Sequence, residues 1–470
     1  MFKHFEFDDQ ITIYFDYNDS SRKNLKLYIN NVLYKTFSSS NVSIYNLDHS
    51  TNYDIKIIDN GNIIFSEMIK TKTKKTIIDV TKEPYLANAD GSVLSTESIQ
   101  KAINDGENSL IYFKKGTYLT GALNIPSNRE IYLEEGATIL GSKDPHDYLP
   151  LVDSRFEGIE LKCLKSLINI GQIDHDSDTN TSNIIIRGNG AIIGGGITLH
   201  DNSLKYEESI SSSELNGRTR GRLISIFNSK DIIIDGLYLS KSPSWNVQYV
   251  YSDNIIISNS HFESFGIHNG DGIDPDSSIN SYIFNCYFDV GDDCVAIKSG
   301  KNPEGNFINR PSENISIFDC QVEKGHGMSI GSEVSGGINN IKIWNCDFER
   351  TLYGLHIKST KKRGGYIKNI DVRDSIIARV IIDEVKYNDD GESSNNITEI
   401  ENISISDSVI SGIIYLDEHR NEKTQAFYID CPGLKLKNIN LNNISIKDST
   451  LTDSKYLETV KEVKFKNIKY

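Results

Sequence analysis

The sequence is poor in features that would place the protein at a membrane or on nucleic acid. Its 470 residues contain no apolar run close to the roughly 18 residues that span a bilayer. Basic residues are the minority, with 50 Lys and Arg against 65 Asp and Glu, and the formal net charge is -15. A net-acidic chain repels phosphate, which disfavours non-specific nucleic-acid binding. We therefore expect neither a membrane nor a nucleic-acid partner.

Cysteine is scarce and shows no metal-binding pattern. The six cysteines form no CxxC pair, which argues against a zinc site, and they are too few for a disulfide-rich scaffold. The glycine-rich stretch 188–198 lies within a strand pattern, so it does not predict a phosphate-binding loop. The N-terminus lacks the basic and then apolar order of a signal peptide. We expect no metal, no cofactor and a cytoplasmic location, or secretion if a leader was removed.

Short alternating runs dominate residues 1–75. Apolar and polar residues alternate and are separated by turn residues, which predicts antiparallel strands. The stretch 47–55 (LDHSTNYDI) resembles the tyrosine corner of fibronectin type III domains. We therefore expect a small antiparallel β-sandwich over 1–75, either fibronectin type III-like or of another kind, with a spacer or docking role.

Residues 76–470 form one repeat array. A phrase recurs at intervals of 26 to 34 residues, in which Asn is followed by alternating apolar residues, then Asn or Asp and a small residue. Its clear copies begin at Asn254, Asn280, Asn314, Asn340, Asn369 and Asn402. Stacked coils of short strands satisfy one another's backbone groups and bury a continuous core. The prediction is an all-β chain, with a right-handed parallel β-helix over 76–470 behind the sandwich.

Two local features follow from this alignment. The sixth position after each Asn places Cys286, Cys320 and Cys346 in one column of small residues, where buried side chains need no disulfide. Residues 95–103, with Ser95 at the N-cap position, predict a short helix. Such a helix would cover the open edge of the first coil.

A second set of phrases lies between the first ones and carries ionisable residues. One predicted column holds the first residue of each phrase: Asp271, Asp293, His326 and Tyr353. Another predicted column on the same face holds Asp276, Lys298 and Lys358. Asp292 immediately precedes Asp293.

This alignment brings three carboxylates, one imidazole and two ammonium groups to one groove wall. Like charges within about 5 Å raise the pKa of one carboxyl group, so a proton stays available at neutral pH. A general acid and a general base can then coexist. Glycoside hydrolysis requires such a pair, with the acid on the glycosidic oxygen and the base on water.

At these positions the sequence resembles glycoside hydrolase family 28, the polygalacturonases. The four short motifs of that family have counterparts at 269–272 (NGDG), 291–294 (GDDC), 325–327 (GHG) and 356–358 (HIK). The resemblance covers about residues 76–470, and a fibronectin-like module in front is similar to exo-polygalacturonase-like members. Two positions depart from the family pattern, because Gly270 replaces Thr and His356 replaces Arg.

The resemblance implies a role for each group. Asp292 is the general acid, and Asp271 and Asp293 activate the attacking water, so the anomeric configuration inverts. His326 orients Asp292 or shares its proton. Lys358 binds a uronate carboxylate as a point charge. The full set of implied substrate-binding residues is Asn269, Lys298, His356, Lys358 and Arg363.

Three features near these motifs leave alternatives open. Because His cannot grip a carboxylate bidentately as Arg does, Arg363 or Lys298 would take over that contact from His356. Trp245 is either a platform for a sugar ring or a buried aromatic residue. The basic residues of the segment 218–222 either rim the cleft or form a solvated loop.

We therefore expect an inverting hydrolase that cleaves α-1,4-galacturonosyl linkages of pectin, exo-acting on oligogalacturonides. His356 keeps open a related hydrolase that acts on rhamnogalacturonan or xylogalacturonan. A calcium-dependent β-helix lyase would lack the motifs at 291–294 and 325–327, and a non-enzymatic β-helix would lack the ionisable cluster. Exo action requires a loop that closes one end of the cleft, for which 143–180 and 197–222 are candidates. The oligomeric state and the product length stay open.

Overall fold

The computed structural model describes residues 1–16, 24–210, 215, 217–417, 420–447, 450 and 463–469. The chain divides into two units, Met1–Thr76 and Ile77–Tyr470, one residue from the boundary predicted by the sequence. Each unit has its own core of buried apolar side chains. In the described ranges, no helix is both long and apolar enough to cross a membrane.

The first unit consists of two antiparallel sheets. One has the order β1-β2-β5 and the other β4-β3-β6-β7. Their strands are β1 (Phe2–Glu6), β2 (Ile11–Phe15), β3 (Leu25–Ile29), β4 (Val32–Phe37), β5 (Asn41–Ile44), β6 (Asn52–Asp59) and β7 (Asn62–Lys70). The Tyr53 hydroxyl accepts a hydrogen bond from the backbone N–H of Asp48 at 2.8 Å, as in a tyrosine corner. The small antiparallel sheets agree with the predicted sandwich, and the fibronectin type III likeness stays a prediction.

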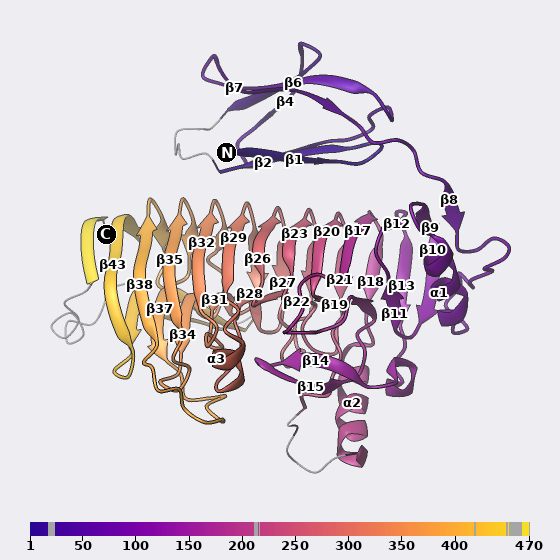
Figure 1. The fold of residues 1–470 in the computed structure, drawn as a ribbon. Coiled ribbons are helices and arrows are strands. Elements are labelled where there is room, and N and C mark those ends of the chain that lie inside the picture. The colour runs from indigo at the N-terminus through magenta and orange to yellow at the C-terminus, as the bar shows by residue number, and fades with distance from the viewer. Residues whose placement is uncertain are drawn as a thin grey trace. The chain divides into compact units, whose positions relative to one another are not determined.

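The second unit is a right-handed parallel β-helix, in which successive coils stack along the axis (Figure 1). Ten strands form one sheet, which carries the functional residues. In order they are β11 (Leu123–Ile125), β16 (Ile168–Ile170), β19 (Ile224–Phe227), β22 (Val247–Val250), β25 (Ile273–Asp276), β28 (Asp293–Ile297), β31 (Gly327–Ile330), β34 (Gly354–Ser359), β37 (Val380–Glu384) and β42 (Phe427–Asp430).

A 23-stranded sheet completes the coils. Its strands are β8 (Ile77–Asp79), β9 (Leu110–Phe113), β10 (Gly116–Thr120), β12 (Arg129–Leu133), β13 (Ala137–Gly141), β17 (Thr181–Gly188), β18 (Ala191–Ile193), β20 (Ser229–Asp235), β21 (Tyr238–Ser240), β23 (Asp253–Ser258), β24 (His261–Glu263), β26 (Ile279–Phe284), β27 (Tyr287–Asp289), β29 (Ser312–Phe318), β30 (Gln321–Lys324), β32 (Ile338–Trp344), β33 (Asp347–Phe348), β35 (Tyr366–Arg373), β36 (Ile376–Ile377), β38 (Glu399–Ser406), β39 (Val409–Ile410), β43 (Lys435–Ile446) and β44 (Val463–Lys469).

Short elements lie outside the coils. They are the helices α1 (Thr96–Asp105), α2 (Gly196–Ile210) and α3 (Glu304–Ile308), the 3₁₀ turn η1 (Pro145–Tyr148), and the hairpins β14 (Val152–Phe156)–β15 (Ile159–Cys163) and β40 (Ile413–Asp417)–β41 (Arg420–Lys423). The predicted helix is α1, which lies at the N-terminal end of the β-helix and buries Ile99, Ala102 and Ile103 (Figure 1).

The repeated asparagines make the corners of the coils. Asn254, Asn280 and their counterparts in the other copies adopt left-handed backbone conformations, with φ between 55° and 59°. Asparagine tolerates this region better than most residues because its short polar side chain bonds locally. The side chains also stack from coil to coil, since the Nδ2 of Asn340 donates to the Oδ1 of Asn314 at 2.7 Å. The repeat phrase is therefore a signature of turn geometry.

The predicted small-residue column is also present. The thiols of Cys286, Cys320 and Cys346 are buried and free, and each donates to the carbonyl oxygen two residues earlier at 3.3 to 3.4 Å. The hydroxyl of Ser260 makes the same bond at 2.8 Å. No disulfide is required, because each polar hydrogen already has a partner.

Candidate active site

A cavity of about 690 Å³ opens on the ten-stranded sheet, where β25, β28, β31 and β34 lie side by side. Seven of the predicted site residues line it: Asn269, Asp271, Asp292, Asp293, Lys298, His326 and Lys358. They come from four successive coils. The structure thus brings together ionisable groups that are far apart in the sequence.

The coil that carries Asp292 and Asp293 contains a bulge. Asp293 pairs with Gly327, and the pairing then shifts by one residue at Cys294. The prediction that Asp293 and His326 share one column is therefore wrong by one residue. The backbone N–H of His326 instead donates to the carbonyl oxygen of Asp292 at 2.8 Å. A bulge re-aims side chains in this way, and here it turns the imidazole toward Asp292.

Asp293 is held as a carboxylate. The ammonium of Lys358 donates to its Oδ2 at 2.9 Å, and the hydroxyl of Ser329 donates to its Oδ1 at 2.7 Å. Burial opposes ionisation, but Lys358, His326 and Lys298 outweigh it and hold the pKa of Asp293 below its usual range. Asp293 is therefore ready to accept a proton at neutral pH.

Asp292 and His326 form a hydrogen-bonded pair at the cavity surface. The His326 Nδ1 lies 2.8 Å from Asp292 Oδ1, which also accepts the backbone N–H of Asp293 at 2.9 Å. Burial lowers the pKa of His326, but Asp292 and Asp293 outweigh it, so the net shift is upward. The Asp292 side chain is 24 % exposed, whereas that of Asp293 is 4 % exposed. Asp292 is thus the more accessible of the two to a bound molecule.

Asp271 shares Lys298 with a carboxylate that the sequence reasoning did not include. The Lys298 Nζ lies 3.1 Å from Asp274 Oδ1 and 3.7 Å from Asp271 Oδ2. Burial, Asp274 and Asp292 raise the pKa of Asp271, and burial raises the pKa of Asp274 to about 7. The predicted carboxyl with a raised pKa is therefore Asp271. Asp274 stands two residues before Asp276, and this period of two was the available signal that it lies on the functional face.

The rim of the cavity comes from three segments outside the stacked strands. Glu157 stands at the turn of the β14–β15 hairpin, Arg218 follows α2, and residues 387–390 follow β37. The Arg218 Nε donates to Glu157 at 2.8 Å, and its Nη1 lies 3.7 Å from Asp390. These contacts join the three segments. The first two lie within the predicted loops 143–180 and 197–222, and the third was not predicted.

Comparison with known proteins assigns these residues to a family. The model described as Glycosyl hydrolases family 28 matches residues 172–468, more than half of the chain. The chain belongs to glycosyl hydrolases family 28. This family 28 chain is therefore a glycoside hydrolase, as the sequence predicts.

The individual relatives are named as polygalacturonases. A probable polygalacturonase from Vitis vinifera is 33% identical over 303 residues, which are 60% of this chain and 57% of that protein. An endo-polygalacturonase from Pectobacterium carotovorum subsp. carotovorum is 28% identical over 357 residues, 71% of this chain and 82% of the relative. The family 28 exopolygalacturonase of Yersinia enterocolitica superposes with a TM-score of 0.83 at 19% identity, covering 99% of this chain and 96% of the other. That last likeness shows the fold, and this chain spans less than two thirds of the Vitis protein.

Two predicted substrate-binding residues of the family 28 chain lie elsewhere. His356 is 5% exposed, and its Nε2 is 2.7 Å from Asp383 Oδ1. Arg363 is fully buried, and its Nε donates to the Ser332 carbonyl at 3.1 Å while its other nitrogens bond to Asn302 and Asn388. Neither is among the described residues that line the cavity. Arg363 instead supports the 387–390 segment from behind, because charge on an arginine this deep must be satisfied by protein groups.

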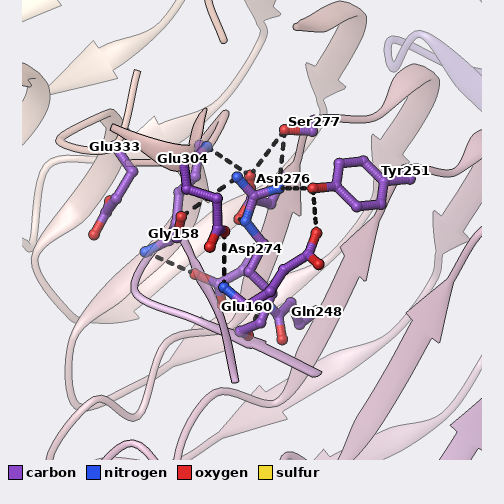
Figure 2. Close-up of polar contacts among 12 residues, drawn as sticks. Gly158, Glu160, Gln248, Tyr251, Asp274, Asp276, Ser277, Glu304 and Glu333 are labelled. Atoms are coloured by element: carbon purple, nitrogen blue, oxygen red, sulfur yellow. Dashed lines mark hydrogen bonds and ion pairs between the residues drawn. The ribbon is translucent and has the colours of Figure 1, made fainter. Parts of the chain in front are cut away.

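The β14–β15 hairpin is fixed to the enzyme by a buried arginine. The Arg155 Nε lies 3.4 Å from Asp276 Oδ2, and its Nη1 donates to Tyr251 at 2.9 Å and to Ser277 at 3.2 Å. The Tyr251 hydroxyl in turn donates to Glu160 of β15 at 2.7 Å. Figure 2 shows Asp276, Tyr251, Ser277 and Glu160 converging on this point. Asp276 therefore serves the hairpin and does not face the cavity, although it pairs with Lys298 as predicted.

Burial and the cavity lining bear on Trp245 and on the basic segment 218–222. Trp245 is 2% exposed and stacks on Phe156 of the hairpin with ring centroids 4.6 Å apart, so it is mainly a buried aromatic residue, although it also lines the catalytic cavity below Lys298, whose ammonium lies 4.5 Å from its ring centroid. The arginines of the 218–222 segment are buried as well, and the Arg220 Nη2 donates to Asn269 Oδ1 at 2.7 Å. The segment is therefore part of the cavity wall, and Asn269 is positioned by it.

One group of side chains in the described part of the chain has the spacing of a metal site. Oxygen atoms of Asp292 and Asp293 and a ring nitrogen of His326 lie within 4.8 Å of one another. Lys358 and Ser329 already bond to the two oxygens of Asp293. An ammonium beside the site disfavours a dication, and the expectation of no metal or cofactor stays a prediction.

Proposed function

We propose that this family 28 enzyme is an inverting polygalacturonase that removes units from the ends of galacturonan chains. The observation that carries the proposal is the single cavity in which Asp271, Asp292 and Asp293 meet His326 and two lysines. An inverting mechanism needs one acid and one ionised base on opposite sides of the glycosidic bond. The cavity offers both states of a carboxyl group, because its residues have pKa values shifted in opposite directions.

In the proposed mechanism, Asp292 donates the proton and Asp293 accepts one. Asp292 is exposed to the cavity and bonded to His326, which can return a proton to it after each cycle. Asp293 stays ionised because of Lys358, so it takes a proton from the attacking water. Asp271, whose pKa is raised by burial and by Asp274 and Asp292, lines the same cavity and orients the attacking water.

The proposed substrate is recognised by its carboxylates. Lys298 and Lys358 supply two positive charges at the cavity floor, where a uronate would replace part of their interaction with Asp274 and Asp293. An uncharged sugar would leave these ammonium groups as they are. The two lysines therefore favour a galacturonan over a neutral polysaccharide, and the pectic substrate agrees with the names of the relatives.

Exo action is supported by the rim. The hairpin turn at Glu157, Arg218 and the 387–390 segment bond to one another, so they form a continuous wall at the rim of the cavity. Asn388 reinforces this contact, because its Oδ1 accepts from Lys301 at 2.6 Å and its Nδ2 donates to Glu333 at 2.7 Å. A chain end fits such a cavity, whereas an internal segment would need an exit on both sides.

The product pattern tests the proposed function. On polygalacturonate we expect reducing ends to accumulate with little fall in viscosity, a single short product from the first time points, and the inverted β anomer by NMR. Rhamnogalacturonan and xylogalacturonan assayed in parallel test the alternative that His356 leaves open. A rapid fall in viscosity would refute exo action, and absorbance from unsaturated uronides would refute hydrolysis. The cytoplasmic location and the oligomeric state stay outside this test.

A pH profile tests the role of Lys358. Replacing Lys358 by Met removes the ammonium next to Asp293 and should raise the pKa of that carboxyl. Because Asp293 must be ionised to accept a proton, we expect the acidic limb of the kcat/KM profile to move to higher pH. Lys361→Met, an exposed lysine three residues away, is the matched control. An unchanged acidic limb in Lys358→Met would show that Asp293 is not the base.

A further inference from the structure

A second cavity lies on the same face of the ten-stranded sheet, outside the catalytic site. It measures about 760 Å³, and we call it the N-terminal trough. Its floor carries Asn124 of β11, Asn169 of β16 and Ser225 of β19, which pair with one another in register from coil to coil. The next two positions of that column are Gln248 and Asp274, on the catalytic coils. The trough and the catalytic cavity therefore lie on one face of the sheet, although Gln248 and Asp274 between them are fully buried.

The β14–β15 hairpin separates the two cavities. Val152, Asp153 and Lys162 of its strands line the trough, whereas Glu157 at its turn lines the catalytic cavity. The hairpin is fixed in place by buried Arg155, as described above. A molecule in the trough therefore lies against the outer side of the wall that closes the active site.

The trough has one unbalanced positive charge. Lys162 and Asp153 form an ion pair at 2.8 Å and cancel each other. Lys165 also lines the trough, and its ammonium has no carboxylate partner among the residues that the structure describes. In a chain with a formal net charge of -15, such a site favours an anion over a cation.

Polar groups of the trough are of the kind that bind sugar hydroxyls. The side chains of Asn124 and Gln172 make no hydrogen bond within the described ranges, so they are free to bind a ligand. Asn169 is held rigidly, because its Nδ2 donates to the carbonyls of Ser166 at 2.7 Å and Leu123 at 3.1 Å. Its Oδ1 accepts from the backbone N–H of Ser166 at 2.9 Å and from the Ser225 hydroxyl at 3.4 Å, so Asn169 gives the trough a rigid floor and the free amides are those of Asn124 and Gln172.

Apolar atoms complete the lining. Leu151 lies on the hairpin side and Phe227 ends the β19 strand of the floor. A mixture of apolar surface, amides and one cation suits a sugar acid, whose ring has C–H faces, hydroxyls and a carboxylate. Stacked coils repeat about every 4.8 Å, so the three coils of the floor span the length of about two sugar units.

We infer that the N-terminal trough is a second saccharide-binding site, and that its ligand is a short acidic segment of the pectic chain. The uronide class rests on the function proposed above. Bound there, a distant part of the same polymer or a neighbouring chain would be held near the active site without entering it. The site would thus raise the local substrate concentration and leave the chemical step unchanged.

The number of bound ligands tests this inference. Calorimetry with trigalacturonate on Asp292→Asn, which keeps the ligand intact, should show two sites. Lys165→Met in that background should weaken one site about tenfold or more, as expected for a lost charge-assisted contact. Gln172→Trp, which fills the trough from an exposed position, should remove the same site. Lys241→Met changes an exposed lysine that lines neither cavity and should leave both sites intact.

Activity separates this inference from the proposed function. In an otherwise natural chain, Lys165→Met and Gln172→Trp should keep kcat and KM on trigalacturonate and raise KM on the polymer, which also shows that the variants fold. If the natural chain hydrolyses trigalacturonate but Asp292→Asn binds one molecule only, the trough is not a saccharide site. Two sites that both survive Gln172→Trp would also overturn the inference. A natural chain that does not hydrolyse trigalacturonate contradicts the proposed function instead.

Discussion

Replacing Asp292 by Asn is expected to lower kcat on oligogalacturonides by about 10²–10⁴-fold, the usual loss when a general acid is removed. The amide cannot donate a proton to the glycosidic oxygen at neutral pH. Its oxygen can still accept the Asp293 N–H that now reaches Asp292 Oδ1 at 2.9 Å, so the fold of the coil should persist. Initial rates from reducing ends, combined with calorimetric binding of trigalacturonate, check the prediction.

Binding and catalysis should separate in this variant. Lys298 and Lys358, which we propose bind the uronate carboxylates, keep their places beside Asp271 and Asp293, so we expect the dissociation constant to change much less than kcat. Asp347→Asn, an exposed acid on β33 of the other sheet, is the control and should behave as the natural chain. An Asp292→Asn enzyme within about threefold of the natural rate would rule out Asp292 as the acid, and Asp271→Asn would then be tested for that role.

The second large effect concerns stability. Arg155→Met should destabilise the β-helix by about 3–5 kcal/mol, because it leaves Asp276 buried without its charged partner. Both tryptophans, Trp245 and Trp344, lie in the β-helix unit, so the midpoint of fluorescence-monitored denaturation reports on that unit. Arg310→Met is the control, since Arg310 also lies over the Tyr251 ring but is partly exposed. Its expected loss is below about 1 kcal/mol.

The pH dependence of the same variant has a defined sign. Burial raises the pKa of Asp276 even while Arg155 opposes that shift, so the loss of Arg155 should raise it further. A carboxyl whose pKa is higher in the folded state destabilises that state as the pH rises above its unfolded value of about 3.9. Arg155→Met should therefore be less destabilised at pH 5 than at pH 8. The double variant with Asp276→Leu should lose less than the sum of the single losses, and simple additivity would show that the two residues are not coupled.

The stacked coils were predictable because each copy of the repeat must form the same corner and the same buried strand. A corner in the left-handed region selects Asn, and the strand after it must alternate around an apolar core, as at Asn314 and Asn340. These constraints act within one coil, so each copy of the repeat has the same residue types at the same positions after its Asn. The helix α1 was predictable for the same reason, since its cap and its apolar positions are local.

The site was predictable in its members and less so in its geometry. Asp271, Asp292, Asp293 and His326 line one cavity, as the motifs indicate. The bulge at Cys294 was not predicted. An extra residue in one coil can be recognised only by comparing how that coil pairs with the next coil in the structure.

Contacts between distant segments were harder still. The pairing of His356 with Asp383 and the burial of Arg363 behind residues 387–390 depend on side chains from neighbouring coils. No local pattern encodes them. The same holds for Arg155, whose partner Asp276 is distant in the sequence.

The corner asparagines have one more consequence. In each clear copy, a second left-handed Asn or Asp stands five residues after the first, as Asn259 follows Asn254 and Asn345 follows Asn340. The interval to the next copy, by contrast, ranges from 26 to 34 residues. Every insertion or deletion is thereby confined to the far side of the coil, which bears the cavities. Substrate specificity can therefore change in proteins of this architecture while the framework of stacked coils stays the same.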